Sequence, residues 1–170
     1  MKRLARFALI VLVASLLASC AKPNSSPADT SEKIEPGDKI GNFLITTGEE
    51  GKVTYGFDLD CGNEEDKENM SCKSTVGKQV NISLGIYDGT HSGKLEEKWA
   101  GFTYELFVED RPIDLQAFGT AEVTHPVVGV IRYWNVVITA SKPGKIAIRD
   151  SGVEDGTPFE STTTLTFSAP

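Results

Sequence analysis

The densest group of residues that could bind a metal ion lies between residues 58 and 68, where Lys67 alone offsets the acidic side chains. Carboxylates supply the hard oxygen ligands that Ca²⁺ prefers. The candidate calcium ligands are Asp58, Asp60, Glu64 and Asp66. The spacing departs from that of an EF-hand loop, because Gly62 stands where a third ligand belongs. Acidic loops on acidic proteins are usually solvated, so we expect no cofactor, with calcium as the alternative.

Two cysteines, Cys61 and Cys72, flank most of this acidic stretch. An even pair of cysteines in an oxidising compartment is expected to form a disulfide. The bond would close a polar loop, and loop entropy predicts that it stabilises the fold by roughly 3 kcal/mol. Zinc bound by the two thiolates is the alternative, although no histidine lies close to them in the sequence to complete such a site.

The sequence holds two histidines, and neither sits in a catalytic pattern. His91 lies in "DGTHSGK", where a nucleophile elbow would require a serine at that position, between a strand and a helix. His125 precedes Pro126 and has no nucleophile or acidic partner close in the sequence. We therefore expect no enzyme. A small envelope hydrolase is the alternative, because spatial separation rather than sequence spacing defines the carboxylate pair of a glycosidase.

Aromatic residues suggest a second kind of site, one that binds a ligand without transforming it. Trp99 lies in the polar segment "LEEKWAGF" and is the best candidate for exposure, and with Tyr87 it is the main candidate for a ligand-binding site. Exposed rings of this kind can stack on a carbohydrate or a peptide. Trp134 lies in a long apolar stretch and is expected in the core, while Tyr133 faces the opposite side of the same strand, so one of the two can be accessible.

The N-terminus has the composition of an export signal. Lys2, Arg3 and Arg6 precede an uncharged run over residues 7–18. As a helix this run would be about 18 Å long, against a hydrocarbon core of roughly 30 Å, so it is too short to span a membrane. A positive start, a short apolar stretch and small residues before a break are typical of a secretory signal.

The run ends in Leu17-Ala18-Ser19-Cys20. This tetrapeptide resembles the lipobox of bacterial lipoprotein signal peptides, Leu-(small)-(small)-Cys. The resemblance implies cleavage before Cys20 and acylation of its thiol and of the new N-terminus, with palmitate as a typical acyl group. It also implies a stable membrane anchor, because several acyl chains bind a membrane stably, whereas a single chain binds it only marginally. An ordinary cleaved signal with a chance cysteine is the alternative. Ala21, where Asp would resemble an inner-membrane retention signal, favours the outer membrane, or the external face of the cell membrane in a host with one membrane.

Removing residues 1–19 takes away three of the 17 basic residues and none of the 24 acidic ones, which leaves 14 against 24 and a formal charge of −10. A surface this acidic repels nucleic acid, so we exclude a nucleic-acid partner. Residues 20–38 contain three prolines and few apolar side chains, and we interpret them as the lipidated cysteine and a flexible linker. The folded domain is expected over residues 39–170.

Apolar residues alternate with polar ones through this domain, as in half-buried strands. The strands are expected over residues 41–47, 52–61, 78–88, 102–110, 113–118, 127–140, 145–150 and 163–169. Residues 102–117 are expected to form a hairpin in which Ile113, Leu115 and Ala117 share one face, and residues 127–140, apolar on both faces, a central strand. About eight strands without intervening helices predict an all-β fold, a single antiparallel immunoglobulin-like β-sandwich.

Taken together, these features predict a lipid-anchored protein of the cell envelope with a non-catalytic binding or interaction domain that faces the periplasm or the exterior. Its partners would be the membrane, through the anchor, and an envelope protein or glycan. A calcium- or carbohydrate-binding surface module is the alternative function. A cleft lined by converging carboxylates would favour a metal-dependent or catalytic role, and an exposed patch or free sheet edge would favour interaction.

Overall fold

The computed structural model describes residues 32–49, 56–57, 60–62, 69–88, 93–154 and 156–170. Within these residues the chain forms two six-stranded sheets and two short helices, so the predicted all-β class is confirmed. The immunoglobulin-like arrangement stays a prediction. In the described part of the chain, no helix is long and apolar enough to cross a membrane.

The first sheet is built around one long strand, β10, as predicted from its apolar composition. Its strands in spatial order are β1 (Lys39–Ile40), β2 (Phe43–Thr47), β10 (Gly129–Ala140), β6 (Gln79–Tyr87) and β3 (Gly56–Phe57). A sixth strand, β9 (Ala121–His125), also pairs with β10, and every pair is antiparallel. β6 covers one edge of β10, while β9 and β2 share the other edge, β9 along residues 129–133 and β2 along residues 136–140.

The second sheet contains the longest ladder, between β11 and β12. Its order is β4 (Asp60–Gly62), β5 (Asn69–Thr75), β12 (Thr157–Ser168), β11 (Gly144–Glu154), β7 (Thr103–Val108) and β8 (Arg111–Pro112). β5 runs parallel to β12, so the prediction of a wholly antiparallel fold is wrong at this pair.

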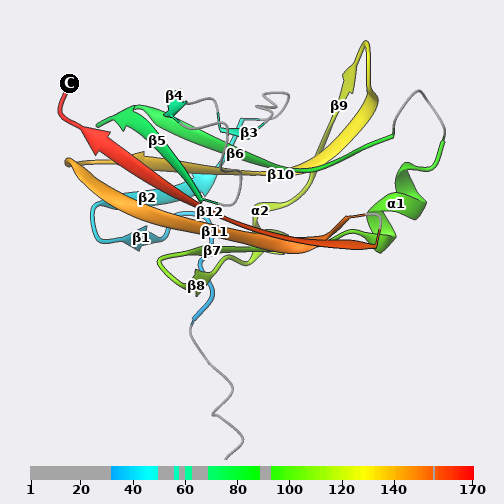
Figure 1. Cartoon of the computed structure of the whole chain (residues 1–170), viewed down its shortest axis with the longest axis horizontal. Helices are drawn as coiled ribbons and strands as arrows, with labels where there is room; N and C mark the ends of the chain where they lie inside the picture. The colour runs from blue at the N-terminus through cyan, green and yellow to red at the C-terminus, as the bar shows by residue number, and fades with distance from the viewer. Residues whose placement is uncertain (1–31, 50–55, 58–59, 63–68, 89–92, 155) are drawn as a thin grey trace, which may run out of the picture. The chain divides into compact units, whose positions relative to one another are not determined.

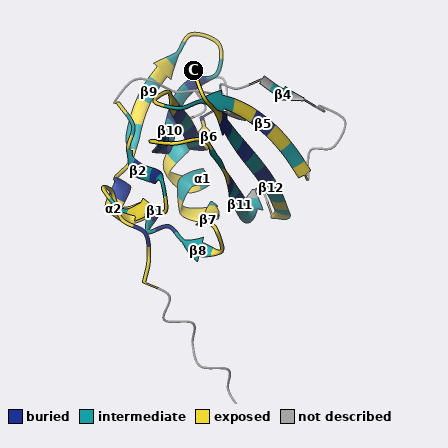
Figure 2. Ribbon diagram, turned by 90° about the vertical axis from the view of Figure 1, so that its left-hand side faces the viewer, coloured by how far each residue is buried: buried dark blue, intermediate teal, exposed yellow. Residues whose placement is uncertain are grey.

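The two sheets pack face to face around one hydrophobic core, because each presents its apolar alternate residues to the other. From β6 and β10 the core takes Val80, Ile82, Leu84, Trp134, Val136 and Ile138. From the second sheet it takes Leu106, Val108, Ile146, Ile148, Leu165 and Phe167. Figure 2 shows the buried residues concentrated on the long strands, whereas β9 is exposed or half-buried. The apolar alternation predicted within residues 78–88, 102–110, 145–150 and 163–169 therefore contributes to the core, whereas most of the strand expected over residues 52–61 lies outside the described residues.

The predicted hairpin over residues 102–117 forms only in part. β7 turns back through Glu109 and Asp110, both with positive φ, but β8 ends at Pro112. A short helix, α2 (Leu115–Phe118), follows, because the Asp114 side chain accepts a hydrogen bond from the backbone N–H of Gln116 and caps its start. The helix buries Leu115 and Phe118 and leaves Ala117 exposed, so the predicted alignment of residues 113, 115 and 117 is wrong.

The packed domain begins before the boundary predicted at residue 39. Ile34 is fully buried, its N–H donates to the carbonyl of Pro112, and its own carbonyl accepts from Asp114. An isolated parallel bridge to Ile113 continues this contact. The part of the predicted linker from Ile34 to Asp38 therefore belongs to the fold, since one apolar side chain among polar neighbours finds a place in the core.

The predicted disulfide between Cys61 and Cys72 is confirmed. The two residues lie directly opposite each other in the antiparallel register of β4 and β5, with Cα atoms 4.1 Å apart. The bond ties the edge strand β4 to the sheet, and Cys72 itself is part of the core.

Candidate binding site

One end of the sandwich carries the helix α1 (Leu95–Gly101), which follows strand β6 (Figure 1). Glu96 and Glu97 lie in its first turn and Lys98 in its last, an arrangement that complements the helix dipole. Asp88, which follows β6, is buried and accepts hydrogen bonds from the backbone N–H groups of Gly93 (3.2 Å) and Lys94 (3.1 Å), so it ties the start of α1 to the end of β6. A helix of two turns gains little stability by itself, so its packing against the sheets decides its position.

Aromatic rings provide that packing. The members of this aromatic cluster are Trp99, Phe102, Tyr104, Trp134 and Phe159. Trp99 of α1 lies against Trp134 of β10, with ring centroids 4.5 Å apart, and Phe102 lies 6.2 Å from Trp134. The cluster continues from Phe102 to Tyr104 and on to Phe159 in the second sheet. It therefore joins α1 to both layers of the sandwich.

Arg132 adds a polar tie between α1 and the first sheet. Its guanidinium group donates to the Glu96 carboxylate of α1 (2.9 Å) and to the Glu122 carboxylate of β9 (2.7 Å), and lies 5.6 Å from the centroid of the Trp99 ring. These hydrogen bonds raise the pKa of Arg132, and the hydrogen bond from Arg132 lowers the pKa of Glu96. Both charged forms are thereby stabilised, and α1 is held at this end of the sandwich.

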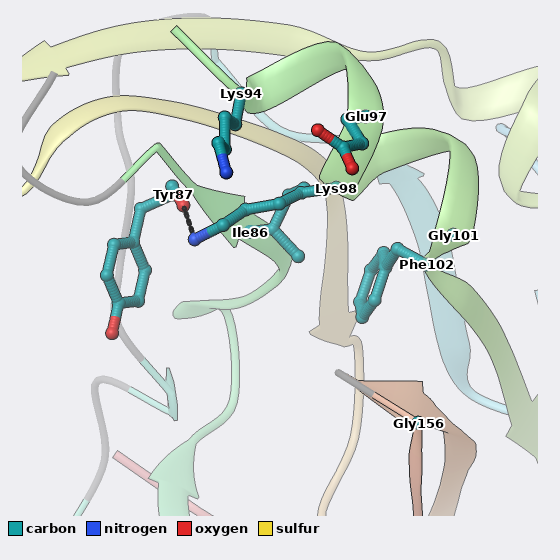
Figure 3. A pocket seen from close by; sticks show the side chains of 8 residues that line it. All are labelled: Ile86, Tyr87, Lys94, Glu97, Lys98, Gly101, Phe102 and Gly156. Carbon is teal, nitrogen blue, oxygen red and sulfur yellow. Dashed lines mark hydrogen bonds between the residues drawn. The ribbon is translucent and has the colours of Figure 1, made fainter. Parts of the chain in front are cut away.

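A concavity of about 390 Å³ opens between α1 and the end of β6. We call it the α1 pocket. It is lined by Ile86, Tyr87, Lys94, Glu97, Lys98, Gly101, Phe102 and Gly156. Figure 3 shows Lys98 of α1 and Lys94, which precedes α1, on the side of Tyr87, with the Phe102 ring at the other side of the pocket. Small-molecule sites commonly combine such aromatic walls with a few charged groups.

The charged groups of the α1 pocket are largely open to a ligand. Lys98 Nζ donates a long hydrogen bond to the Tyr87 carbonyl (3.5 Å) and lies 5.8 Å from the centroid of the Tyr87 ring. Neither Lys94 nor Glu97 takes part in an ion pair within the described part of the chain. Two ammonium groups and one carboxylate thus meet at the rim of a pocket with aromatic walls.

A second concavity, the aromatic groove, lies on the other side of Phe102, and the members of the aromatic cluster other than Trp99 line it. Gly152 of β11 also lines it and pairs with Tyr104 on one side and Phe159 on the other. A Cβ atom at Gly152 would lie 2.8 Å from Phe159 Cζ, so the glycine makes room for that ring. The buried indole N–H of Trp134 finds no protein acceptor among the described residues, which suits a water or ligand oxygen.

Tyr104 also anchors a polar network at the far side of the groove. Its hydroxyl donates to Asp150 (2.8 Å), and the Ser161 hydroxyl donates to the other oxygen of the same carboxylate. Burial of the ring, followed by the charge of Asp150 and this hydrogen bond, raises the pKa of Tyr104 well above its ordinary value. The phenol therefore stays protonated and acts as a donor to Asp150.

The structure confirms the predicted burial of Trp134 and corrects the predicted exposure of Trp99. Trp134 is in the core as expected, and Tyr87 is 48% exposed. Trp99 is half-buried rather than exposed, because its ring turns onto Trp134. Tyr133 is fully buried, with the small residues Gly85 and Ala121 as its partners in the register of the sheet, so neither residue of the pair is accessible.

Several other predicted site residues cannot be placed. Asp58, Glu64, Asp66 and His91 lie outside the described residues, and Asp60 lies in β4. No cluster of three or more His, Cys, Asp or Glu side chains suited to a metal occurs in the part of the chain that the structure describes. At the end of β9, His125 Nδ1 accepts the backbone N–H groups of Val127 and Val128, so this ring helps to shape the β9–β10 turn.

Sequence reasoning missed Lys94, Lys98 and Phe102 as members of the site. The two lysines are four residues apart, and the carbonyl of Lys94, the N-cap of α1, accepts the backbone N–H of Lys98, so they lie on the same side of the first turn. The spacing of the two lysines can be read from the sequence, but their position beside Tyr87 depends on the packing of α1 against β6.

Comparisons with known proteins add little about function. No protein-family model matches the sequence, and a search of curated proteins finds no match. Among solved structures, PbICP-C in complex with falcipain-2 is similar to this chain at 19% identity. The similarity covers 65% of this chain and 95% of the other chain, with a TM-score of 0.32. A likeness at this level carries no argument about what this chain does.

Proposed function

We propose that this chain is a lipid-anchored protein of the bacterial cell envelope, and that its β domain is a non-catalytic binding module. Cys20 would carry the acyl chains, and the domain would face the periplasm or the exterior from the outer membrane or the cell membrane. The anchor is inferred from Leu17-Ala18-Ser19-Cys20 and from the basic and apolar residues before it.

The observation that carries the binding role is the α1 pocket. It offers a volume of about 390 Å³ and an exposed Tyr87 ring, with lysine ammonium groups beside it. Exposed aromatic rings cost free energy in water and are characteristic of recognition surfaces. α1 is tied to both sheets by the aromatic cluster and by Arg132, which reduces the entropy that this helix loses when a ligand binds.

The anchoring part is tested in the protein's own host with the wild-type chain and a Cys20→Ala variant. We expect the wild type to partition into the detergent phase of a membrane extract and to incorporate labelled palmitate, and the variant to incorporate none. Wild-type protein in the aqueous phase would contradict the anchor.

The binding part is tested with the lipidated protein in detergent micelles and soluble fragments of the host's envelope polymers. We expect Tyr87→Ala to weaken binding at least fivefold, because truncating a stacking ring removes about 1 kcal/mol or more. Val127→Ala is the matched control, since Val127 is 73% exposed and does not line the α1 pocket. Equal binding by the wild type and Tyr87→Ala would contradict a binding role for the pocket.

A further inference from the structure

We propose that the α1 pocket binds an acidic saccharide, in which a sugar ring that bears a carboxylate lies between Tyr87 and Phe102. This inference rests on the proposed binding function and names the chemical class of the ligand. It follows from the charge, the rings and the size of the pocket, taken in turn below.

The charge of the pocket runs against the charge of the protein. After removal of residues 1–19 the chain carries a formal charge of −10. At the α1 pocket, by contrast, Lys94 and Lys98 outnumber Glu97. Lys94, the N-cap of α1, lies four residues before Lys98, and both side chains extend on the side of Tyr87 (Figure 3). Their mutual repulsion is relieved when one anionic group lies between them, so a carboxylate is favoured there.

The rings of the pocket favour a ligand with a flat apolar face. Tyr87 and Phe102 line it from β6 and from the end of α1, and Ile86 adds an aliphatic wall. The C–H face of a pyranose packs against such rings, as apolar surface is removed from water on both partners. A small inorganic anion would leave these walls in contact with water.

Glu97 distinguishes a sugar from an acidic peptide. Its carboxylate lines the pocket beside the lysines and can accept hydrogen bonds from sugar hydroxyl groups. Triglutamate carries three side-chain carboxylates and no hydroxyl group, so it would place more negative charge near Glu97 than a saccharide with one carboxylate per ring. The volume of about 390 Å³ also lies near the lower end of the range for ligand sites, which suits one sugar ring better than an extended backbone.

The test is isothermal titration calorimetry on the lipidated full-length protein in micelles. The probes are digalacturonic acid, its neutral counterpart galactobiose, and triglutamate as an acidic peptide. The two tryptophans of the chain both belong to the aromatic cluster, so their fluorescence gives a second readout of binding close to Phe102. We expect digalacturonic acid to bind at least fivefold more tightly than galactobiose.

Lys94→Gln and Lys98→Gln are expected to weaken digalacturonic acid binding by up to about fivefold each, as removal of a partly exposed charge does, and to leave galactobiose unaffected. Lys145→Gln is the matched control, since it removes the same charge from an exposed lysine of β11 that does not line the pocket. Tyr87→Ala is expected to weaken both sugars.

Three outcomes would overturn the inference. If both sugars bind alike and depend on Tyr87, the binding function stands and the acidic class is wrong. If triglutamate binds more tightly than digalacturonic acid through the same lysines, the ligand is a peptide. If neither sugar binds while Tyr87→Ala still abolishes binding of envelope fragments, the saccharide class fails but the proposed function survives. If neither sugar binds and Tyr87→Ala also leaves the binding of envelope fragments unchanged, the proposed binding function is wrong as well.

Discussion

A single methyl group at Gly152 tests whether the aromatic end of the sandwich is packed as described. In Gly152→Ala the new Cβ would lie 2.2 Å from the backbone oxygen of Thr103 and 2.8 Å from Phe159 Cζ. Real Cβ contacts do not fall below 3.0 Å, so β11 and β7 would have to separate by about 0.8 Å, the difference between 3.0 and 2.2 Å, or distort locally. The Phe159 ring would also be displaced from its place next to Tyr104.

Overpacking of this kind costs about 1–3 kcal/mol. Replacing glycine also removes freedom from the unfolded chain, which returns about 0.4–1 kcal/mol. We therefore expect Gly152→Ala to lower the free energy of unfolding by about 1–2 kcal/mol and the thermal midpoint by roughly 4–8 °C.

The matched control is Gly101→Ala at the last residue of α1. A Cβ there would meet no atom within 4 Å, and α1 is helical up to this residue, so the same exchange should be neutral or stabilising by up to about 1 kcal/mol. Urea unfolding followed by tryptophan fluorescence and by far-UV circular dichroism measures both variants. The reasoning would be refuted if Gly152→Ala were as stable as the wild type, or if the two variants shifted in the same direction.

Three further predictions concern other contacts in the structure. Replacing Cys61 and Cys72 together by serine should lower the free energy of unfolding, measured in urea, by about 3 kcal/mol, to the level of the reduced wild type. A smaller loss would mean that the disulfide does not constrain the unfolded chain as loop entropy predicts. The pKa of Tyr104 in the folded state lies above its unfolded value of about 10, so the stabilisation that the protonated phenol provides is complete below pH 10 and is lost as the pH rises further. The wild type should therefore lose stability between pH 10 and 12 more steeply than Tyr104→Phe. Parallel stability curves for the two proteins would contradict this. Arg132→Met should shift the fluorescence of Trp99 to longer wavelength by releasing α1, and an unchanged spectrum would show that the aromatic cluster alone holds the helix.

The strands that the sequence predicts well are those whose apolar residues alternate without interruption. In β6 the residues Val80, Ile82, Leu84 and Ile86 are all buried, as period-two alternation requires. β5 escapes such reasoning because Cys72 is its one buried side chain. β5 is a strand because it pairs with β12 and is bonded to β4 through the disulfide. Neither interaction can be inferred from the residues of β5 itself.

At helix α2 the sequence predicts a strand where the structure has a helix. The stretch that contains Ile113 and Leu115 has a strand-like pattern, but the capping carboxylate of Asp114 and the positive φ of Gly119 favour a single helical turn between them. Local hydrogen bonds outweigh a short apolar alternation at this position.

The candidate site was predictable in part. Tyr87 is a candidate by its residue type, and the structure leaves it 48% exposed. The place of Trp99 depends on its contact with Trp134, a residue distant in the sequence, and its surroundings in the chain are polar. The lysines of the α1 pocket are four residues apart in the sequence, but they lie beside Tyr87 only through the packing of α1 against β6.

The location of the domain is tested most directly by the intact mass of the protein purified from the membranes of its own host. The account predicts a chain that begins at Cys20 and carries a diacylglyceryl group on its thiol and an acyl group on its amine. A chain that still begins at Met1, or an unmodified Cys20, would contradict it.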